Sequence, residues 1–336
     1  MTTRTTRAVC LVRRPARDPV PEDFAIEERP LPALGAGQLL VRNVYLSVDP
    51  SLRGRLQQAR MHYTHNLVPG EPLDGRALGE VVASRTPGIE PGRFVRHQLG
   101  WREHAVVEAR HVSIVDPVLA PLPTWLGLLG STGFTAYVGL LRAGELRPGD
   151  TVFVSAAAGA VGSAAGQFAR LLGAKRVVGS AGSERKRRVL TEEFRYDGAL
   201  DYRAERVRDG LARLAPHGID LYFDNVGGEH LVAALHALRP GGRVALCGAM
   251  SRDGETHDLR HLMQAVLKRI TLRGFIVRDH EDLRPEFERC VAGWLASGEL
   301  VARETVVEGL DNAVGAWLSM LRGGNIGKML VQVGEA

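Results

Sequence analysis

Apolar positions follow two different patterns along the chain. Up to about residue 120 they form short runs that Pro and Gly separate, at Ala8–Val12, Leu39–Val48, Leu78–Ala83 and Glu103–Val107. Many short strands with such turns favour a small barrel-like domain. From Thr124 onwards, runs typical of buried strands alternate with segments of helical spacing. This alternation predicts βαβ units around a parallel sheet.

The second pattern can be divided into elements. The strands expected are Thr151–Val154, Arg176–Gly179, Gly198–Asp201, Ile219–Asp224, Arg243–Cys247 and Ile270–Ile276. The helices expected between them are Thr124–Arg142, Ala160–Leu172, Ser183–Phe194 and Glu229–Leu238, with a turn at Pro240-Gly241-Gly242. The tail predicts a helix over Glu281–Ala296, a strand over Thr305–Val307, a helix over Asp311–Leu321 and a strand over Lys328–Val333.

The position of the last strand predicts the domain organisation. It follows a completed nucleotide-binding pattern and can return to the first region to pair there. We therefore expect a first domain formed by residues 1–123 and 305–336, with residues 124–304 forming a second domain between them. A length of 336 residues fits two domains.

Composition and charge narrow the class of protein. Apolar residues make up 45% of the chain and charged residues 24%, as in soluble globular proteins. The net charge of +5 comes without a long basic stripe, so we expect no nucleic-acid partner. No apolar run is long enough to span a membrane, and the N-terminus lacks the apolar core of a signal peptide. Cys10, Cys247 and Cys290 show no paired spacing, which favours a reducing cytoplasm.

The strongest motif is the segment Val152–Gly162, which has the pattern of a strand, a turn of small residues and the start of a helix. Gly159 allows the backbone to approach a pyrophosphate, and Gly162 allows the helix to pack close to the strand. The unpaired amides of the helix N-terminus can bind the anion. A purely structural turn is the alternative, but the strand–turn–helix context favours a dinucleotide site.

The end of the second predicted strand indicates which dinucleotide binds. NAD enzymes usually place an acid there to hold the ribose hydroxyls. This chain has Gly179–Ser183 instead, with no carboxylate before Glu184. Cations follow at once, and we expect Lys186 or Arg185 to contact a 2′-phosphate, which favours NADPH. The remaining arginines of this run fit an exposed helix face better.

Two further segments end predicted strands, Phe223–Gly228 and Cys247–Ser251. A doubly wound sheet binds its ligand at the carboxyl ends of its strands. The small residues of both segments would let a nicotinamide ribose lie against the backbone.

The sequence lacks the residues for two common kinds of alcohol chemistry. None of the three cysteines has a neighbouring ligand at zinc-site spacing, and His62 and His65 resemble loop residues, so no metal is expected. No Tyr is followed by Lys four positions later, which excludes the Tyr-x-x-x-Lys pair of short-chain dehydrogenases. Reduction of a double bond conjugated to a carbonyl does not require such an acid–base group. The cofactor delivers hydride to the β-carbon, and the enolate is then protonated.

Five stretches together resemble the zinc-independent medium-chain dehydrogenases/reductases of the group that includes prostaglandin reductase, leukotriene B4 12-hydroxydehydrogenase and curcumin reductase. They are Asn43–Pro50, Gly133–Tyr137, Ala156–Gly166, Phe223–Gly228 and Asn325–Met329. The resemblance implies an α/β fold, with a doubly wound Rossmann sheet that binds NADPH and a GroES-like β-barrel domain built from both chain ends. It also implies a homodimer.

The resemblance further implies which residues contact NADPH, with Lys186 as the partner of the 2′-phosphate. Tyr202 could instead be a half-buried aromatic at a strand end, and Asn325 a turn residue after two glycines. The residues implied are Gly159, Ala160, Val161, Gly162, Lys186, Tyr202, Asn225, Cys247, Gly248, Ala249, Met250, Ser251, Phe275, Ile276, Val277 and Asn325.

The chain departs from the family at two positions where the substrate is expected. Relatives often carry Tyr directly after Asp-Pro, where this chain has Ser51. They often carry another Tyr shortly after the Cys-Gly run, where this chain has Ser251–Gly254. Ser51 and Asp253 are therefore the candidates for the substrate pocket, and no proton donor is assigned. The exchanges favour a more polar substrate than a lipid enone or a phenylpropenal.

These features favour an NADPH-dependent reductase of a carbon–carbon double bond conjugated to a carbonyl, in an enone, enal or enoyl compound. A quinone reductase on the same scaffold and a non-catalytic NADPH-binding protein are the alternatives. Turnover of an enone panel against quinones would separate the first two. Cofactor binding without any turnover would indicate the third.

Overall fold

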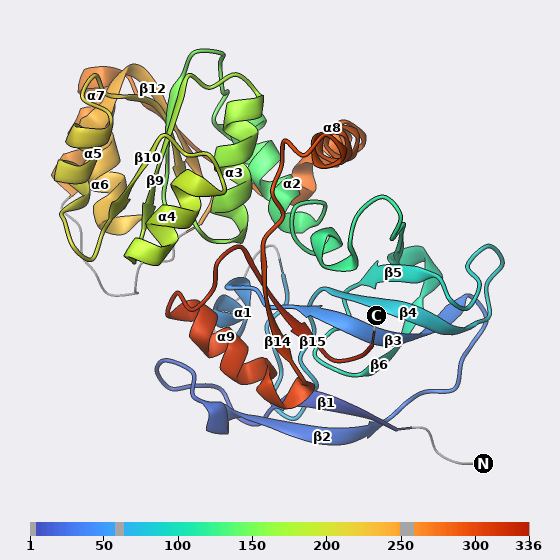
Figure 1. Cartoon of the computed structure of the whole chain (residues 1–336). Helices are drawn as coiled ribbons and strands as arrows, with labels where there is room; N and C mark the ends of the chain where they lie inside the picture. Colours follow the sequence, from blue (N-terminus) through green and yellow to red (C-terminus); the bar gives the residue numbers. More distant parts are fainter. Residues whose placement is uncertain (1–4, 58–63, 249–258, 336) are drawn as a thin grey trace. The chain divides into compact units, whose positions relative to one another are not determined.

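The computed structural model of the chain describes residues 5–57, 64–248 and 259–335 (Figure 1). The chain divides into two compact units, Met1–Leu126 with Glu304–Ala336, and Gly127–Arg303. None of the helices in the described ranges combines the length and the apolar character needed to cross a bilayer.

The first unit is built around a mixed seven-stranded sheet of order β14-β15-β3-β4-β5-β7, with β6 paired to β3 as well. β15 runs antiparallel to β3 and parallel to β14, so the last two strands of the chain belong to this sheet. The strands are β3 (Gln38–Ser47), β4 (Ala77–Ser84), β5 (Phe94–His97), β6 (His104–Glu108), β7 (Ser113–Val115), β14 (Glu304–Glu308) and β15 (Lys328–Gln332).

An antiparallel ribbon of β1 (Thr5–Leu11) and β2 (Phe24–Pro30) completes the first unit. Fully buried Trp317, on helix α9 (Ala313–Leu321), meets the ring of Phe24 edge-on, with centroids 5.9 Å apart. The sequence does not predict β2, because charged residues interrupt its apolar positions. The hydrogen bonds to β1 stabilise this strand, although its own sequence pattern does not predict one.

The second unit contains the predicted doubly wound sheet. Its strands are all parallel in the order β10-β9-β8-β11-β12-β13, which is the Rossmann order with its crossover between β8 and β11. The predicted fold class, a Rossmann sheet with a GroES-like domain, is confirmed. The strands are β8 (Thr151–Val154), β9 (Arg176–Ala181), β10 (Gly198–Asp201), β11 (Ile219–Asp224), β12 (Leu238–Leu246) and β13 (Thr271–Gly274).

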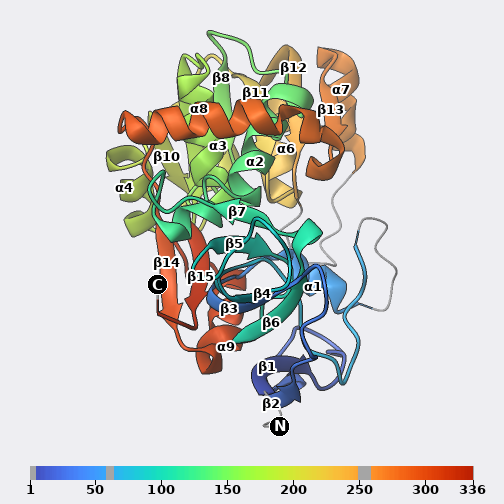
Figure 2. The ribbon, with the colours of Figure 1, turned by 90° about the vertical axis from the view of Figure 1, so that its right-hand side faces the viewer.

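Helices cover both faces of this sheet. Helix α8 runs across α2 and α3 (Figure 2), and the three meet through Phe134, Tyr137, Phe168 and Phe287. Helices α5 and α6 pack on the other side, in a core cluster that contains Tyr222. The helices are α2 (Ser131–Val138), α3 (Ala160–Leu171), α4 (Glu184–Glu192), α5 (Val207–Leu214), α6 (Gly228–Ala237), α7 (Met263–Lys268) and α8 (Arg284–Ala296).

Two predicted helices are shorter than expected. The helix expected from Thr124 begins only at Ser131, because Gly130 adopts an extended conformation as its N-cap. It continues into a π-helical turn over Gly139–Ala143. The helix expected from Glu281 is α-helical only from Arg284, since a proline lies in its first turn and 3-10 turns precede it.

The expected turn at Pro240–Gly242 is instead part of a strand. β12 runs through it, and its pairing with β11 shifts between Leu238, opposite Ile219, and Arg243, opposite Leu221. Gly241 has a φ of 77°, which a bulge tolerates when the residue is glycine. The strand is therefore bulged rather than interrupted.

Candidate active site

The turn between β8 and α3 is the segment predicted to bind the cofactor. It is tightly folded: Ala156 has a φ of 46°, and Ala157 N donates to Ser180 O at 2.9 Å. Gly159 is the N-cap of α3, and its carbonyl accepts from Ser163 N at 2.8 Å. The amides that precede Ser163 in the helix therefore point out of its N-terminus, as an anion site requires.

Two glycines keep this turn free of side chains. A Cβ added at Gly162 would collide with the backbone of Ala156 and Ala157, so α3 can approach the turn only because this residue is glycine. At Gly159 an added Cβ would lie 3.2 Å from Ala156 O, which is tight. The surface facing a bound pyrophosphate is therefore bare backbone, and the turn fits a dinucleotide.

Asp224 organises the end of β11, the neighbour of β8. Its Oδ1 accepts from Tyr222 Oη at 2.7 Å and from the amides of Val226 and Gly227 at 2.9 and 2.7 Å. Burial raises the pKa of Asp224, although these donors act in the opposite direction. Asp224 lies in the segment Phe223–Gly228 that is expected to border the ligand, but the sequence did not predict its own role. A carboxylate at the last position of a buried strand is the signal that could have found it.

Ser155 ties the end of β8 to the same network. Its Oγ lies 2.9 Å from Tyr222 Oη and accepts from Asn225 N at 2.9 Å, while its carbonyl accepts from Asn225 Nδ2 at 2.8 Å. Asn225 is one of the expected cofactor contacts, and it is 8% exposed. Its side-chain nitrogen is therefore used to fix the two strand ends, which leaves the carbonyl oxygen for a ligand.

The end of β12 joins the same group through the Asp224 carbonyl, which accepts from the amides of Cys247 at 2.9 Å and Gly248 at 3.1 Å. Burial, with a further contribution from the charge of Asp224, raises the pKa of Cys247 to about 12. The thiol stays protonated and is not a nucleophile. The expected residues Ala249, Met250, Ser251 and Asp253 lie outside the described residues.

The segment after β13 carries three more expected contacts. Phe275 is half-buried, and its ring reaches Gly139, where an added Cβ would lie 2.8 Å from Phe275 Cζ. Ile276 is 38% exposed, and Val277 begins a 3-10 segment. This segment is thus anchored by its aromatic ring, while the next side chain remains accessible.

A cationic group lies at the ends of β9 and β10. Ser183 caps α4 and accepts from Lys186 N at 3.3 Å. Tyr202 is 41% exposed, and the guanidinium carbon of Arg203 lies 5.9 Å from the centroid of its ring. Burial, together with the charge of Arg203, lowers the pKa of Lys186. Two cations therefore lie near each other beside an aromatic ring. Arg203 was not predicted from the sequence, in which its position next to Tyr202 was the available signal.

Two other residues define the surroundings of this group. The ring of His230 meets Tyr202 edge-on with centroids 5.3 Å apart, and burial lowers the pKa of His230 to about 4. The imidazole is therefore neutral at pH 7. Arg187 donates hydrogen bonds to Ala199 O at 3.1 Å and to the Glu184 carboxylate at 2.8 Å. Its guanidinium is therefore used by contacts around α4, as expected.

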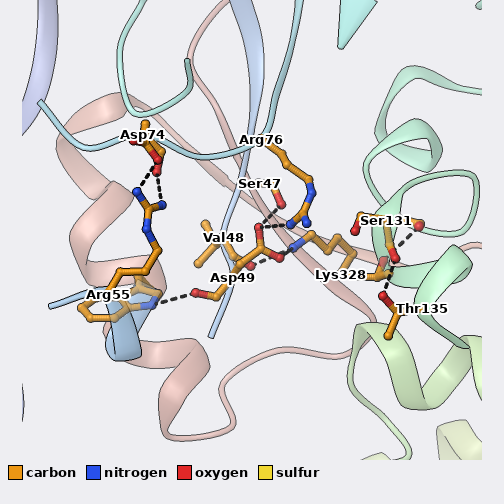
Figure 3. Close-up of polar contacts among 12 residues, drawn as sticks. Ser47, Val48, Asp49, Arg55, Asp74, Arg76, Ser131, Thr135 and Lys328 are labelled. Carbon is orange, nitrogen blue, oxygen red and sulfur yellow. Dashed lines mark hydrogen bonds and ion pairs between the residues drawn. The ribbon is translucent and has the colours of Figure 1, made fainter. Parts of the chain in front are cut away.

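The first unit holds the other two expected residues, Ser51 and Asn325. Ser51 is exposed and opens the short helix α1 (Ser51–Arg55). Asn325 is 8% exposed, and its Nδ2 donates to Gly327 O at 2.7 Å, which closes the turn before β15. Asp49, two residues before Ser51, forms an ion pair with Lys328, three residues after Asn325 (Figure 3). Within the described ranges, no three or more His, Cys, Asp or Glu side chains are grouped to hold a metal ion.

Comparison with known proteins identifies the family. Residues 7–115 match the family described as the N-terminal domain of oxidoreductase, and residues 160–293 match the family described as zinc-binding dehydrogenase. The Bacillus subtilis protein YfmJ, assigned only provisionally as an NADP-dependent oxidoreductase, is 39% identical over 339 aligned positions that cover 99% of both chains. An NADP(+)-dependent 2-alkenal reductase of Nicotiana tabacum is 37% identical over 303 positions, covering 89% of this chain and 88% of the relative.

A solved structure agrees with these sequence matches. The crystal structure of CurA in complex with NADPH from Vibrio vulnificus superposes with a TM-score of 0.91 at 36% identity, covering 98% of this chain and 100% of that one. The expected cofactor, NADPH, is thereby confirmed. The chain belongs to the medium-chain dehydrogenase/reductase superfamily, in the group of the prostaglandin, curcumin and alkenal reductases, and is an NADPH-dependent oxidoreductase of the double-bond reductase type.

Proposed function

We propose that the enzyme reduces a carbon–carbon double bond conjugated to a carbonyl, with hydride delivered to the β-carbon. The observation that carries the proposal is the bonding at the ends of β8 and β11. Burial raises the pKa of Tyr222 well above its usual value, and its hydroxyl donates to Asp224. Neither group is free to act as a general acid toward the oxygen of a carbonyl that is being reduced. A conjugated acceptor needs no such group, because orientation and polarisation of its carbonyl suffice.

Two further observations support this substrate class. The tobacco relative is named for 2-alkenals, which are α,β-unsaturated aldehydes. Ser51, exposed at the start of α1, occupies a position where tyrosine is frequent in the family. The smaller, hydroxylated side chain favours a more polar acceptor than a lipid enone.

Bound NADPH supplies the hydride, and the residues of the chain position it. The amides of Ala160, Val161 and Gly162 face the pyrophosphate, as the N-terminus of α3 allows. Lys186 and Arg203 would hold the 2′-phosphate through charge-assisted hydrogen bonds. The exposed ring of Tyr202 would contact the cofactor beside this phosphate. Asn225, Cys247, Gly248 and Phe275–Val277 would border the nicotinamide half.

The α-carbon is protonated by water. A serine hydroxyl such as that of Ser51 is too weak an acid, and an aspartate is normally ionised at pH 7. Asp253 is the alternative donor if burial raises its pKa. It lies outside the described residues.

Isotope labelling tests the reaction. Reduction of a 2-alkenal with 4-deuterated NADPH in ordinary water should label the β-carbon, and reduction with unlabelled NADPH in deuterium oxide should label the α-carbon. Deuterium from the cofactor on a carbinol carbon would show carbonyl reduction and contradict the proposal. Turnover with quinones and none with any enone would point to quinone reduction instead.

We also propose a homodimer that forms at the open edge of the Rossmann sheet. β13 is an edge strand, and the preceding helix α7 exposes Met263, Val266 and Leu267 by 56%, 70% and 63%. An unpaired strand edge beside exposed apolar side chains favours association. Sedimentation should show a dimer that Val266→Glu dissociates, whereas Val118→Glu, at an exposed position of the other unit, should leave it intact. A wild-type monomer would refute the dimer.

A further inference from the structure

A buried ion pair links the segments of the first unit that carry Ser51 and Asn325 (Figure 3). Lys328 Nζ lies 2.9 Å from Asp49 Oδ1 and donates to Val48 O at 2.8 Å. Only 4% of the Lys328 side chain and 16% of the Asp49 side chain are exposed. The two charges are therefore held together largely out of contact with water.

The second carboxylate oxygen and the carbonyl of Asp49 are also bonded. Its Oδ2 accepts from Ser47 Oγ at 2.7 Å and lies 3.4 Å from Arg76 Nη1, while its carbonyl accepts from Trp317 Nε1 at 3.2 Å. Burial by itself would raise the pKa of Asp49. The charges of Lys328 and Arg76 outweigh it and hold that pKa well below its usual range. Asp49 is thus ionised throughout the working pH range and fixed on every side.

Each member of the pair is a close neighbour in sequence of one expected contact residue. Lys328 directly follows Gly327, which has a φ of 66° and whose carbonyl receives the Asn325 side-chain amide at 2.7 Å. On the other side, Asp49 is separated from Ser51 by a single proline. A shift of either charge would therefore move the Asn325 turn relative to the start of α1.

A buried ion pair can determine the geometry of a site without adding to the stability of the fold. Removing two charges from water costs about as much as their attraction returns, so apolar residues of similar volume can often replace such a pair without loss of stability. Apolar contacts between two side chains, however, do not require a particular distance or angle between them. The ammonium and the carboxylate must meet their acceptors and donors at set distances and angles.

We propose that Asp49 and Lys328 are positioning residues that hold the Asn325 turn and the Ser51 helix in the geometry that cofactor and substrate require. The inference rests on the proposed function and on the expectation that Asn325 contacts NADPH and Ser51 borders the substrate. Asp49 and Lys328 act through these two residues and touch neither ligand themselves.

The test replaces the pair by apolar residues, in the variant Asp49→Leu/Lys328→Met. The matched control, Arg42→Met/Glu80→Leu, removes a 2.5 Å ion pair between β3 and β4 of the same unit. Circular dichroism and the urea midpoint of the Asp49/Lys328 variant should stay close to wild type. The Kd for NADPH should rise, and kcat/KM for a 2-alkenal should fall, each by about tenfold or more, as misplacement of contact groups predicts. The control should change neither constant. Lys328→Met alone leaves the buried carboxylate of Asp49 with only Ser47 and Arg76, so it should lower the urea midpoint more than the double variant does.

Two results would overturn the proposal. One is a Kd for NADPH and a kcat/KM that both remain at wild-type values in the Asp49/Lys328 variant. The other is unfolding of that variant, because the pair would then be an element of stability. Failure of the proposed function is distinguishable, since the wild type itself would then not reduce 2-alkenals. The Kd for NADPH, measured by the fluorescence of the bound cofactor, would still test the positioning role.

Discussion

The hydroxyl of Tyr202 lies against the backbone of Gly182, so that a methyl group added at Gly182 would come within 2.6 Å of Tyr202 Oη. This contact sets the phenol ring beside the start of α4. Arg203 lies near the face of the ring, and Lys186 belongs to the first turn of that helix. A ring and two cations thus gather where NAD enzymes place an acid.

This arrangement predicts how cofactor preference responds to mutation. Each charge-assisted contact to a phosphate contributes about 1.5–3 kcal/mol. Lys186→Ala and Arg203→Ala should therefore each raise the KM for NADPH about tenfold or more and leave the KM for NADH nearly unchanged. Arg188→Ala, at an exposed position of the same helix, serves as the control. An unchanged KM for NADPH in Lys186→Ala would show that this lysine does not bind the phosphate.

The two glycines of the cofactor turn predict effects of different size. Gly162→Ala places a Cβ against the backbone of Ala156 and Ala157, which cannot move without displacing the turn. It should lower the free energy of unfolding by about 1–3 kcal/mol and weaken NADPH binding. Gly159→Ala, with its nearest neighbour at 3.2 Å and an ordinary negative φ, should cost less stability, but its methyl group would lie where the backbone approaches the pyrophosphate and should also weaken NADPH binding. Urea denaturation and cofactor titration of both variants measure the difference. Equal effects on stability would contradict the packing argument.

His97 predicts a pH dependence of stability. Its Nδ1 accepts from Leu99 N at 3.1 Å and its Nε2 lies 2.8 Å from Asn43 Oδ1, so the neutral ring fits the site. Burial, with the charge of Arg102 adding to it, lowers the pKa of His97 to about 3. The unfolded chain takes up this proton near pH 6.5. Between these values the unfolded state binds more protons, so stability is full above pH 6.5 and falls as the pH drops.

The measurement is the free energy of unfolding at pH 7 and at pH 5. His97→Gln keeps an amide donor for Asn43 but does not titrate. The variant should be less stable at pH 7 and should lose less stability between the two pH values than the wild type. A wild-type stability that does not change over this range would contradict the burial-induced shift.

The composition of the sequence predicts that activity needs no metal. No cysteine has a neighbouring ligand at zinc-site spacing, and hydride transfer to a conjugated double bond calls for no Lewis acid when hydrogen bonds polarise the carbonyl. Dialysis against a chelator should leave kcat and KM intact, and elemental analysis of the active protein should find no stoichiometric zinc. Loss of activity that zinc alone restores would overturn this expectation.

The sequence by itself determined the elements that depend on residues close together in the chain. The strands Thr151–Val154, Gly198–Asp201 and Ile219–Asp224 have the bounds that the apolar runs and their flanking turn residues predict. The cofactor turn was equally readable, because its strand, its glycines and its helix are contiguous. Periodicity and turn chemistry act over a few residues, and such patterns survive in a single sequence.

Tertiary structure decided the features that depend on pairing across long separations. Ser155 and Asp224 are 69 residues apart in sequence, and Asp49 and Lys328 are 279 residues apart. Nothing local marks either pair as partners, since each side chain alone could be a solvated surface group. Strand β2, with its charged positions, exists because β1 supplies its hydrogen bonds. These contacts form only once the sheets bring distant strand ends together, and burial then makes a satisfied polar partner obligatory.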